Sequence, residues 1–462
     1  MEVIIEVGYL LATISFILGL KFMSSPEKAK TGNLIAAIGM VLAVVLTFTA
    51  GITETVPYTN LVIILVAIAI GTLVGKRLSD KVEMTGMPQL VSLFNATGGG
   101  CAMLLGMVEA NPMHPQETDL TFQVLLIAGL ITGAIAFTGS IIAERKLAGK
   151  VKDRRTMGVV FSARILLALM ILLPIVYFTV GLPIGFAPFM FSLAALAMIY
   201  GVLFVLPIGG ADMPVVISLL NSITGIATAF TGLVYGNKVM IAGGIFVGAA
   251  GIFLTLLMCT AMNRSLMKVL AGKFKKSTGT ASEEDQEIKE ISISETALAL
   301  SFAQKVAVIP GYGLAVAQAQ HICAQLDQLL DKRDCEVNYI IHPVAGRMPG
   351  HMNVLLAEAN IDYSRLKEMD EGNEMMSEYD VVLVIGANDV VNPAAENNPD
   401  SPVYGMPIIR AHEAKQVVVM KRGMSKGYAG VVNELFELEN CSLLFGDAKA
   451  SLQEIVNQLK LI

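Results

Sequence analysis

The feature that most restricts the fold is a series of nine long apolar stretches in the first 261 residues. Each is close to 20 residues long, which is the length of an α-helix that crosses a bilayer. The predicted spans are residues 3–20, 33–53, 59–75, 86–108, 121–143, 157–180, 183–205, 213–234 and 239–261. The first has no basic leader and no small-residue cleavage site, so we expect a membrane span and not a cleaved signal peptide.

Basic residues are concentrated in every second loop between these spans. They are Lys21, Lys28 and Lys30, then Lys76, Arg77 and Lys81, then six between 145 and 155, and five between 264 and 276. The other loops carry only Lys238, beside the acidic Glu54, Glu109, Glu117 and Asp119. Because basic loops stay in the cytoplasm, we expect the N-terminus outside and the C-terminal part inside. An odd number of spans requires the same arrangement.

The composition changes sharply after residue 276. Residues 1–276 hold 19 Lys and Arg against 12 Asp and Glu, whereas residues 277–462 hold 14 against 27. The acidic second half argues against nucleic acid as a partner, since such proteins present basic surfaces. The five cysteines and five histidines are dispersed, so we predict no disulfide framework and no metal site. We expect a membrane domain at 1–264, a polar linker at 265–292 and a folded domain at 293–462.

Two segments of the membrane half resemble each other. Residues 87–95 and 213–221 share Met, Pro, Ser, Leu and Asn at five of nine positions. We interpret them as a parallel repeat, and transport sites often lie at repeat interfaces. The alternative is chance, because proline is common in the first turn of any helix.

Each segment ends in an asparagine, Asn95 or Asn221, two turns into its span. An amide at that depth needs partners or water, so we predict that both belong to a proton pathway. Thr224, Gly225, Thr228 and Thr231 share one helical face with Asn221, which equally suits helix packing. Asp212 precedes the second segment, and we include it in the proton pathway. Its local role is either a helix cap or the delivery of protons, and we favour the cap.

The second half alternates apolar segments with helical stretches. Residues 305–309, 336–341, 380–385, 416–420 and 442–445 are predicted strands, and the first is followed by a helix from Leu314 to about Leu330. This alternation predicts a parallel sheet with helices on both faces. Ligands of such sheets bind at the carboxyl ends of the strands.

Glycines and cations follow these strand ends. Gly311-Tyr312-Gly313 resembles a dinucleotide-binding turn, although the third fingerprint position is Val316, and an ordinary strand–helix turn remains the alternative. The second strand ends in His342, where NAD-binding sheets place an acid for the ribose hydroxyl. Lys421 and Arg422 follow another strand and suit a 2′-phosphate, so we expect NADP instead of NAD. The alternative is a solvated basic pair.

Longer motifs resemble one family. They are HPVAGRMPGHMNVLLAEA at 342–359, GAND at 386–389, KR at 421–422 with GYAG at 427–430, FGDAK at 445–449 and GGADMP at 209–214. Together they resemble the β subunit of proton-translocating nicotinamide nucleotide transhydrogenases, and the resemblance covers essentially the whole chain. It implies a polytopic α-helical membrane domain followed by a C-terminal Rossmann-like α/β domain.

The resemblance also implies a set of residues around NADP(H), in a binding mode reversed relative to most Rossmann domains. We therefore expect the cofactor to contact Gly311, Tyr312, Gly313, Val344, Ala345, Gly346, Arg347, Met348, Pro349, Gly386, Ala387, Asn388, Asp389, Val390, Gly405, Met406, Lys421, Arg422, Gly423, Met424, Ser425, Lys426, Gly427, Tyr428, Asp447 and Ala448. Asp389 is also implicated in coupling. Some members carry a histidine where this chain has Asn95, so the titrating group of the proton pathway is left open.

The implied activity is hydride transfer from NADH to NADP⁺, driven by protons moving inward. No catalytic side chain is expected, because hydride passes directly between the nicotinamides. The family's NAD(H)-binding domain is not expected on this chain, so a separate α subunit should hold NADH. The family suggests a dimer of αβ units in a bacterial inner membrane. The alternatives are a nucleotide-sensing channel or transporter, and a structural membrane anchor.

Overall fold

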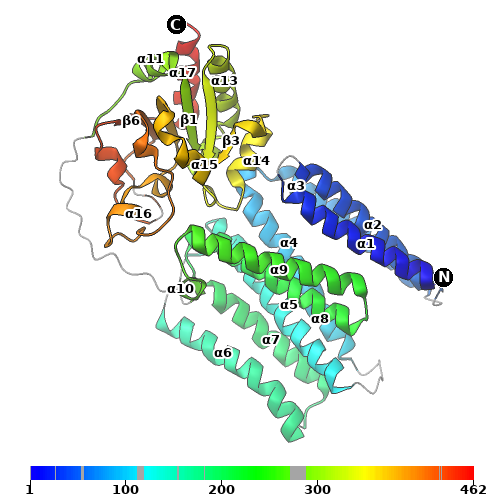
Figure 1. Cartoon of the computed structure of the whole chain (residues 1–462). Coiled ribbons are helices and arrows are strands. Elements are labelled where there is room, and N and C mark those ends of the chain that lie inside the picture. Colours follow the sequence, from blue (N-terminus) through cyan, green and yellow to red (C-terminus); the bar gives the residue numbers. More distant parts are fainter. Residues whose placement is uncertain are drawn as a thin grey trace. The chain divides into compact units, whose positions relative to one another are not determined.

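The computed structural model describes residues 2–25, 28–53, 57–111, 119–152, 154, 156–181, 183–270, 288–425, 427 and 429–462. Contacts divide the chain into two units, which are described separately. One contains apolar helices and the other a sheet with its helices (Figure 1).

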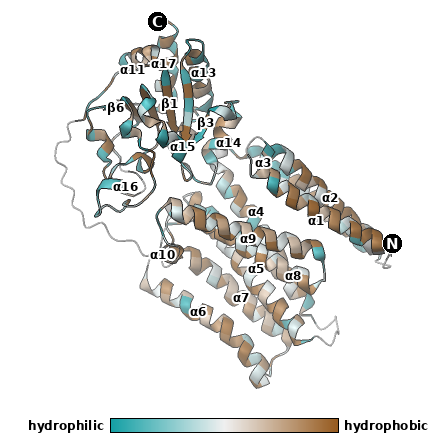
Figure 2. Ribbon diagram, in the orientation of Figure 1, coloured by the Kyte–Doolittle hydropathy of each residue, from teal (hydrophilic) through white to brown (hydrophobic). Residues whose placement is uncertain are grey.

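The helical unit contains the predicted membrane spans. Nine helices within the described ranges are long and apolar enough to cross a membrane, which confirms the predicted number. They are α1 (Glu2–Met23), α2 (Ala29–Thr53), α3 (Tyr58–Lys81), α4 (Met87–Glu109), α5 (Leu120–Leu147), α6 (Met157–Val176), α7 (Phe186–Val205), α8 (Met213–Val234) and α9 (Lys238–Ala261). In Figure 2 the ribbons of these helices are coloured mainly as hydrophobic, and many of their large apolar residues are exposed, as expected of helices that face lipid. A short helix, α10 (Leu266–Leu270), follows.

Glycines allow the central helices to approach closely. A Cβ atom on Gly99 of α4 would lie 2.8 Å from the carbonyl oxygen of Gly133 on α5. A Cβ atom on Gly225 of α8 would lie 2.9 Å from the carbonyl oxygen of Gly244 on α9. Small residues at helix contacts are typical of membrane proteins, where close backbone packing drives association. These contacts pack α4 against α5 and α8 against α9, and α8 also packs against α4 and α5.

The second unit contains one six-stranded, entirely parallel sheet. Its strands are β1 (Lys305–Pro310), β2 (Glu336–Ile341), β3 (Leu366–Glu368), β4 (Val381–Ile385), β5 (Gln416–Lys421) and β6 (Cys441–Phe445), in the order β3-β2-β1-β4-β5-β6. This is the order of the doubly wound dinucleotide-binding fold. The five predicted strands are confirmed within one residue at each end, and the predicted fold class is correct.

Helices flank the sheet. They are α11 (Ile293–Phe302), α12 (Tyr312–Ala317), α13 (Gln320–Asp331), α14 (His351–Glu358), α15 (Met369–Glu374), α16 (Ala394–Asn397) and α17 (Ala448–Leu459). The predicted single helix from Leu314 to Leu330 is wrong, because the chain breaks at Gln318. That residue adopts a left-handed φ of 50° and ends α12 before α13 begins. Buried Ile309, Val384 and Val419 form part of the unit's own core.

The residues that enter this unit lie along the sheet edge. Leu443 of β6 donates its N–H to the Lys289 carbonyl oxygen at 2.8 Å, and Ile291 donates to the Leu443 carbonyl oxygen at 3.0 Å. Ser292 and Glu295 then form a capping box that starts α11. Residues 288–292 of the predicted linker are therefore ordered against the sheet, and its residues 271–287 lie outside the described ranges.

Candidate functional site

The candidate cofactor site lies where the strand order reverses, between β1 and β4. Their carboxyl ends are neighbours, with Pro310 opposite Ile385. The Gly311 N–H donates to the Ile385 carbonyl oxygen at 2.9 Å, and the Gly313 N–H donates to the Gly386 carbonyl oxygen at 3.0 Å. Such a reversal is the usual ligand position in an open parallel sheet. The predicted glycine turn and the predicted Gly386–Val390 loop therefore meet at this point.

The glycines at this point are required by contact between two backbones. A Cβ atom on Gly313 would lie 2.6 Å from the Cα atom of Gly386. Gly386 itself has a φ of 68°, a left-handed conformation that suits glycine. A Cβ atom on Gly311 would likewise overlap the Gly386–Ala387 backbone. We conclude that these glycines fix the two loops to each other, a role the sequence pattern alone did not indicate.

A buried histidine holds the loop that follows β2. His342 is 1% exposed, and its Nδ1 accepts the Val344 N–H at 3.2 Å. Because Nδ1 accepts, the ring proton is on Nε2, which donates to the Pro407 carbonyl oxygen at 2.8 Å. This bond joins the predicted 344–349 loop to the chain just after the predicted Gly405 and Met406.

His351 supports the same loop from inside. It is 0% exposed, and its Nδ1 accepts the Arg347 N–H at 3.1 Å. Gly346 has a φ of 103°, and a Cβ there would lie 2.7 Å from the Cβ of His351. The Arg347 guanidinium then lies 4.4 Å from the centre of the Tyr312 ring, a cation–π geometry. Two candidate contacts far apart in sequence, Tyr312 and Arg347, are thus brought together.

The two histidines should make the stability of the sheet unit depend on pH. Burial lowers the pKa of His342, and burial together with Arg347 lowers the pKa of His351. A depressed folded-state pKa gives stability that is present above the unfolded value of about 6.5 and is lost as the pH falls through the folded value. We expect the free energy of unfolding of residues 288–462 to fall below pH 6.5, by at most about 1.4 kcal/mol per pH unit for each histidine.

Denaturant unfolding of wild type and two variants between pH 7.5 and 5 tests this. His342→Asn keeps an acceptor near Nδ1 but loses the bond to Pro407. It should lose about 1–3 kcal/mol at pH 7.5 and show a shallower decline. His321→Asn, on the exposed face of α13, is the matched control and should follow wild type. An equally steep decline in His342→Asn would contradict the assignment to His342.

Asp389 joins the loops that follow β4 and β5. Its Oδ2 accepts the Ala429 N–H at 2.9 Å, and the neighbouring Asn388 carbonyl accepts from Asn433 Nδ2 at 3.0 Å. A Cβ atom on Gly427 would overlap the Asp389 carboxylate. The predicted 386–390 loop therefore lies beside Gly427 and Ala429, in the segment that follows β5. Asn433 was not predicted, because a lone asparagine after an irregular segment carries no signal.

The predicted cations differ in their surroundings. Lys421, the last residue of β5, donates from Nζ to the Ser425 carbonyl oxygen at 3.1 Å and lies 4.6 Å from the Phe436 ring centre. Burial lowers the pKa of Lys421, and the nearby Asp389 partly opposes this. Arg422 is exposed. The pair therefore offers one held ammonium group and one accessible guanidinium at the same strand end.

The remaining candidates also follow strand ends. Gly423, Met424 and Ser425 follow β5, whereas Lys426 and Tyr428 lie outside the described residues. Asp447 follows β6 and caps α17, because its Oδ1 accepts the N–H groups of Lys449 and Ala450, both at 3.1 Å. Parallel strands place all these ends at one edge of the sheet.

In the helical unit, Asn95 forms a buried polar contact. It is 8% exposed, and its Nδ2 donates to Ser140 Oγ of α5 at 2.8 Å. Ser92 Oγ donates to the Ser140 carbonyl oxygen, also at 2.8 Å. The Asn95 Oδ1 is buried without a partner in the part of the chain that the structure describes. Ser140 was not predicted, since a single serine in an apolar span is common.

The second repeat segment differs in burial. Asn221 is exposed on this chain, whereas Thr224, Gly225 and Thr231 are buried. Thr224 and Thr231 donate to the carbonyl oxygens four residues earlier, at 3.1 and 2.9 Å. Together with the close contact of Gly225 to α9, this favours the helix-packing interpretation for that face.

Both repeat segments begin in the same way. A short 3₁₀ turn, Met84–Gly86 or Gly210–Asp212, leads into a helix with proline in its first turn. Asp212 takes the N-cap position of α8, but its side chain makes no capping hydrogen bond and is 1% exposed. The preferred capping role was therefore wrong, because Asp212 has a helical backbone, with φ −90° and ψ −1°, and not the extended one in which a side chain reaches the first free N–H groups.

Comparison with known proteins covers nearly the entire chain. Residues 5–458 match the family described as NAD(P) transhydrogenase beta subunit. Two curated proteins from Rhodospirillum rubrum, both named NAD(P) transhydrogenase subunit beta, are each 41% identical over 467 residues. The alignments cover 98% of this chain and 98% of each relative. With its apolar helices and dinucleotide-type sheet, this chain belongs to the family of NAD(P) transhydrogenase beta subunits, an oxidoreductase component of the membrane.

Proposed function

We propose that this chain carries the NADP(H) site of the transhydrogenase and accepts hydride from NADH held by a separate α subunit. The observation that carries the proposal is the pair Lys421 and Arg422 at the carboxyl end of β5. The position after β2, where an NAD site needs a carboxylate, is taken by His342, whose two ring nitrogens are both engaged by backbone. This charge pattern favours a ligand with a 2′-phosphate.

The surrounding loops fit such a cofactor. Arg422 is accessible to bind phosphate with its planar fork, and Lys421 would exchange its weak bond to the Ser425 carbonyl for the phosphate. The loops at 344–349, 386–390 and 405–406 would line the rest of the molecule, and Asp447 with Ala448 would complete it. The bound nicotinamide supplies the hydride chemistry, so these side chains need only bind, orient and exclude water.

Calorimetric titration of residues 288–462 with NADP⁺ and with NAD⁺ tests the cofactor assignment. This unit has its own core and a complete sheet, so we expect it to fold alone. NADP⁺ should bind at least about 100-fold more tightly than NAD⁺, because each charge-assisted bond to the 2′-phosphate contributes about 1.5–3 kcal/mol. A preference for NAD⁺ in the folded unit would overturn the 2′-phosphate argument and favour a nucleotide sensor.

We also propose that hydride transfer is coupled to protons that move inward through the helical unit. The buried contact of Asn95 with Ser140, which leaves an oxygen able to accept from water, supports this pathway. Asp212 is a buried residue just before α8, and Asn221 is the ninth residue of that helix. Protonation along this path would shift the sheet unit between occluded and exchanging states.

Substitution of residues in this path should reduce proton movement without reducing NADP⁺ binding. Asp212→Asn, Asn221→Ala and Asn95→Ala should each lower proton uptake at least about tenfold in vesicles containing the complex, since a pathway without one of its polar groups raises the barrier by about 1.4 kcal/mol or more. NADP⁺ binding should change less than twofold. Thr97→Val, an exposed position on α4, is the matched control and should pump normally. Normal coupling in all three variants would reject the pathway.

The proposed setting is a bacterial inner membrane with the N-terminus outside and residues 293–462 in the cytoplasm. The alternating basic loops support this orientation. The membrane domain is proposed to comprise residues 1–264, connected through residues 265–292. The family's subunit name supports an α partner, and we propose a dimer of αβ units.

A further inference from the structure

A polar pair closes the ends of α4 and α8 that lie opposite Asp212. Tyr235 follows the last residue of α8, and its hydroxyl donates to Glu109 Oε1, on the last residue of α4, at 2.7 Å. Burial, together with this hydrogen bond, raises the pKa of Tyr235. The phenol therefore stays protonated, and its hydroxyl holds the Glu109 carboxyl group in place.

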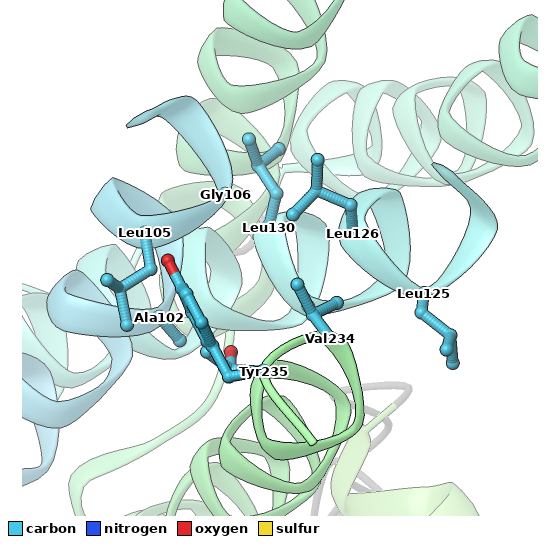
Figure 3. Close-up of a pocket in the computed structure, with 10 residues that line it drawn as sticks. Ala102, Leu105, Gly106, Leu125, Leu126, Leu130, Val234 and Tyr235 are labelled. Carbon is cyan, nitrogen blue, oxygen red and sulfur yellow. The ribbon is translucent and has the colours of Figure 1, made fainter. Parts of the chain in front are cut away.

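A small cavity lies directly beneath this pair. Tyr235 lines it together with Thr231 of α8, Gly106 of α4 and Leu130 of α5, and Figure 3 shows the Tyr235 ring beside Ala102 and Leu105. Its volume is about 10 Å³, close to the lower limit for one water molecule. The Thr231 hydroxyl and the Tyr235 hydroxyl can both accept a hydrogen bond from such a water.

Small and hydroxyl-bearing residues continue from the cavity toward Asn95. Gly106 and Gly98 remove side-chain bulk along α4, and Thr231 and Thr224 face α4 and α5 from α8. A Cβ on Gly98 would lie 3.1 Å from the Thr224 Cγ2, so these helices meet at that level. Glu109 and Asn95 are 14 residues apart on one helix, which is about 21 Å. Asn95 lies at the inner end of this row of small and hydroxyl-bearing residues, and its Oδ1 has no hydrogen-bond partner among the described residues.

We propose that Glu109, positioned by Tyr235, is the proton acceptor at the outer mouth of the pathway. The inference rests on the proposed proton translocation. The carboxylate takes a proton from the outer solution and becomes the neutral acid. It then passes that proton to water in the cavity and is restored as the carboxylate. Only O–H bonds form and break, and the net result is one proton moved inward.

Another carboxylate at the same side of the membrane provides the contrast. Glu6 of α1 binds Lys238 at 2.7 Å, and the two side chains are 63% and 72% exposed. Its charge is already neutralised by a cation, whereas the partner that the described residues give Glu109 is a phenol. Glu6 therefore serves as the matched control.

The test uses the complex with its α subunit in liposomes, with an imposed pH gradient driving NADP⁺ reduction by NADH. Glu109→Gln should lower the gradient-driven rate at least about fivefold, and Glu109→Asp should restore part of it. Tyr235→Phe should also lower the rate, and it should lower it no further when combined with Glu109→Gln, because the hydroxyl acts only by holding that carboxyl group. Glu6→Gln should match wild type. NADP⁺ affinity should stay within twofold in every variant.

The outcomes separate the two proposals. Wild-type rates from Glu109→Gln, or a further loss of rate when Tyr235→Phe is added to it, would overturn the role of Glu109 while leaving proton coupling intact. A wild-type complex whose rate ignores the gradient would instead refute the proposed translocation itself. Glu109→Asp guards against misfolding, because a folded Asp variant without any recovery of rate also contradicts the proposal.

Discussion

Replacing both Lys421 and Arg422 by alanine should weaken NADP⁺ binding by at least about 100-fold while changing NAD⁺ binding less than about threefold. Two charge-assisted hydrogen bonds to a 2′-phosphate contribute about 1.5–3 kcal/mol each, and each 1.4 kcal/mol is tenfold in affinity. NAD⁺ has no 2′-phosphate, so it cannot lose those bonds. Calorimetric titration of residues 288–462 with both nucleotides measures the difference directly.

Single substitutions and a control make the result specific. Arg422→Lys should lose most of the NADP⁺ affinity that the guanidinium group contributes, because an ammonium group cannot bind phosphate in a bidentate manner. Lys415→Ala is the matched control, because Lys415 lies just before β5 at its opposite end and pairs with Asp380 at 2.8 Å. That exposed pair should matter little to binding. Equal weakening of NADP⁺ and NAD⁺ by the double variant would indicate general electrostatic attraction and no phosphate site.

Gly386→Ala should destabilise the sheet unit by about 2–5 kcal/mol. A left-handed conformation costs a non-glycine residue about 1–2 kcal/mol. The new Cβ would also overlap the Gly313 backbone, which cannot move as a side chain can, and overpacking of that kind adds about 1–3 kcal/mol. Denaturant unfolding of residues 288–462 followed by circular dichroism measures the loss.

A second glycine provides the comparison. A Cβ on Gly423, after β5, would meet no atom of the described residues within 4 Å, so Gly423→Ala should change stability by less than about 1 kcal/mol. If Gly386→Ala also stays within that limit, the two loops are not held by backbone contact. We expect the destabilised Gly386 variant to lose NADP⁺ binding as well, since the candidate contacts at 386–390 depend on this turn.

The sequence predicted the strands of the sheet well, because runs such as Val381–Ile385 are apolar enough to be buried on both faces. It missed β3, whose three residues include a lysine and a glutamate and which exists only by pairing with β2. It also missed the break at Gln318, since no glycine or proline marks that left-handed residue. Local patterns identify segments with strong intrinsic preferences, and tertiary contacts decide the rest.

Some features of the candidate sites could likewise be predicted from the sequence, and others could not. Strand ends and the length of apolar stretches placed Lys421, Arg422 and the membrane helices from sequence alone. The hydrogen bond of Asn95 to Ser140 and that of Tyr235 to Glu109 join residues 45 and 126 positions apart. The periodic pattern of residues in a sequence does not indicate which distant side chains form such hydrogen bonds. The opposite burial of Asn95 and Asn221, which follow similar motifs, depends on which helices surround each copy.

The glycine contact at the carboxyl ends of β1 and β4 gives the candidate cofactor site one fixed side and one movable side. Backbone touches backbone at Gly313 and Gly386, so neither loop can shift without the other. The facing loop after β5 is attached differently, through side-chain bonds such as that of Asp389 to the Ala429 N–H. Breaking such a bond costs about 0.5–3 kcal/mol, far less than refolding the turn. Entry and release of a nucleotide would therefore proceed on the β5 side, with the β1–β4 side as the stationary frame.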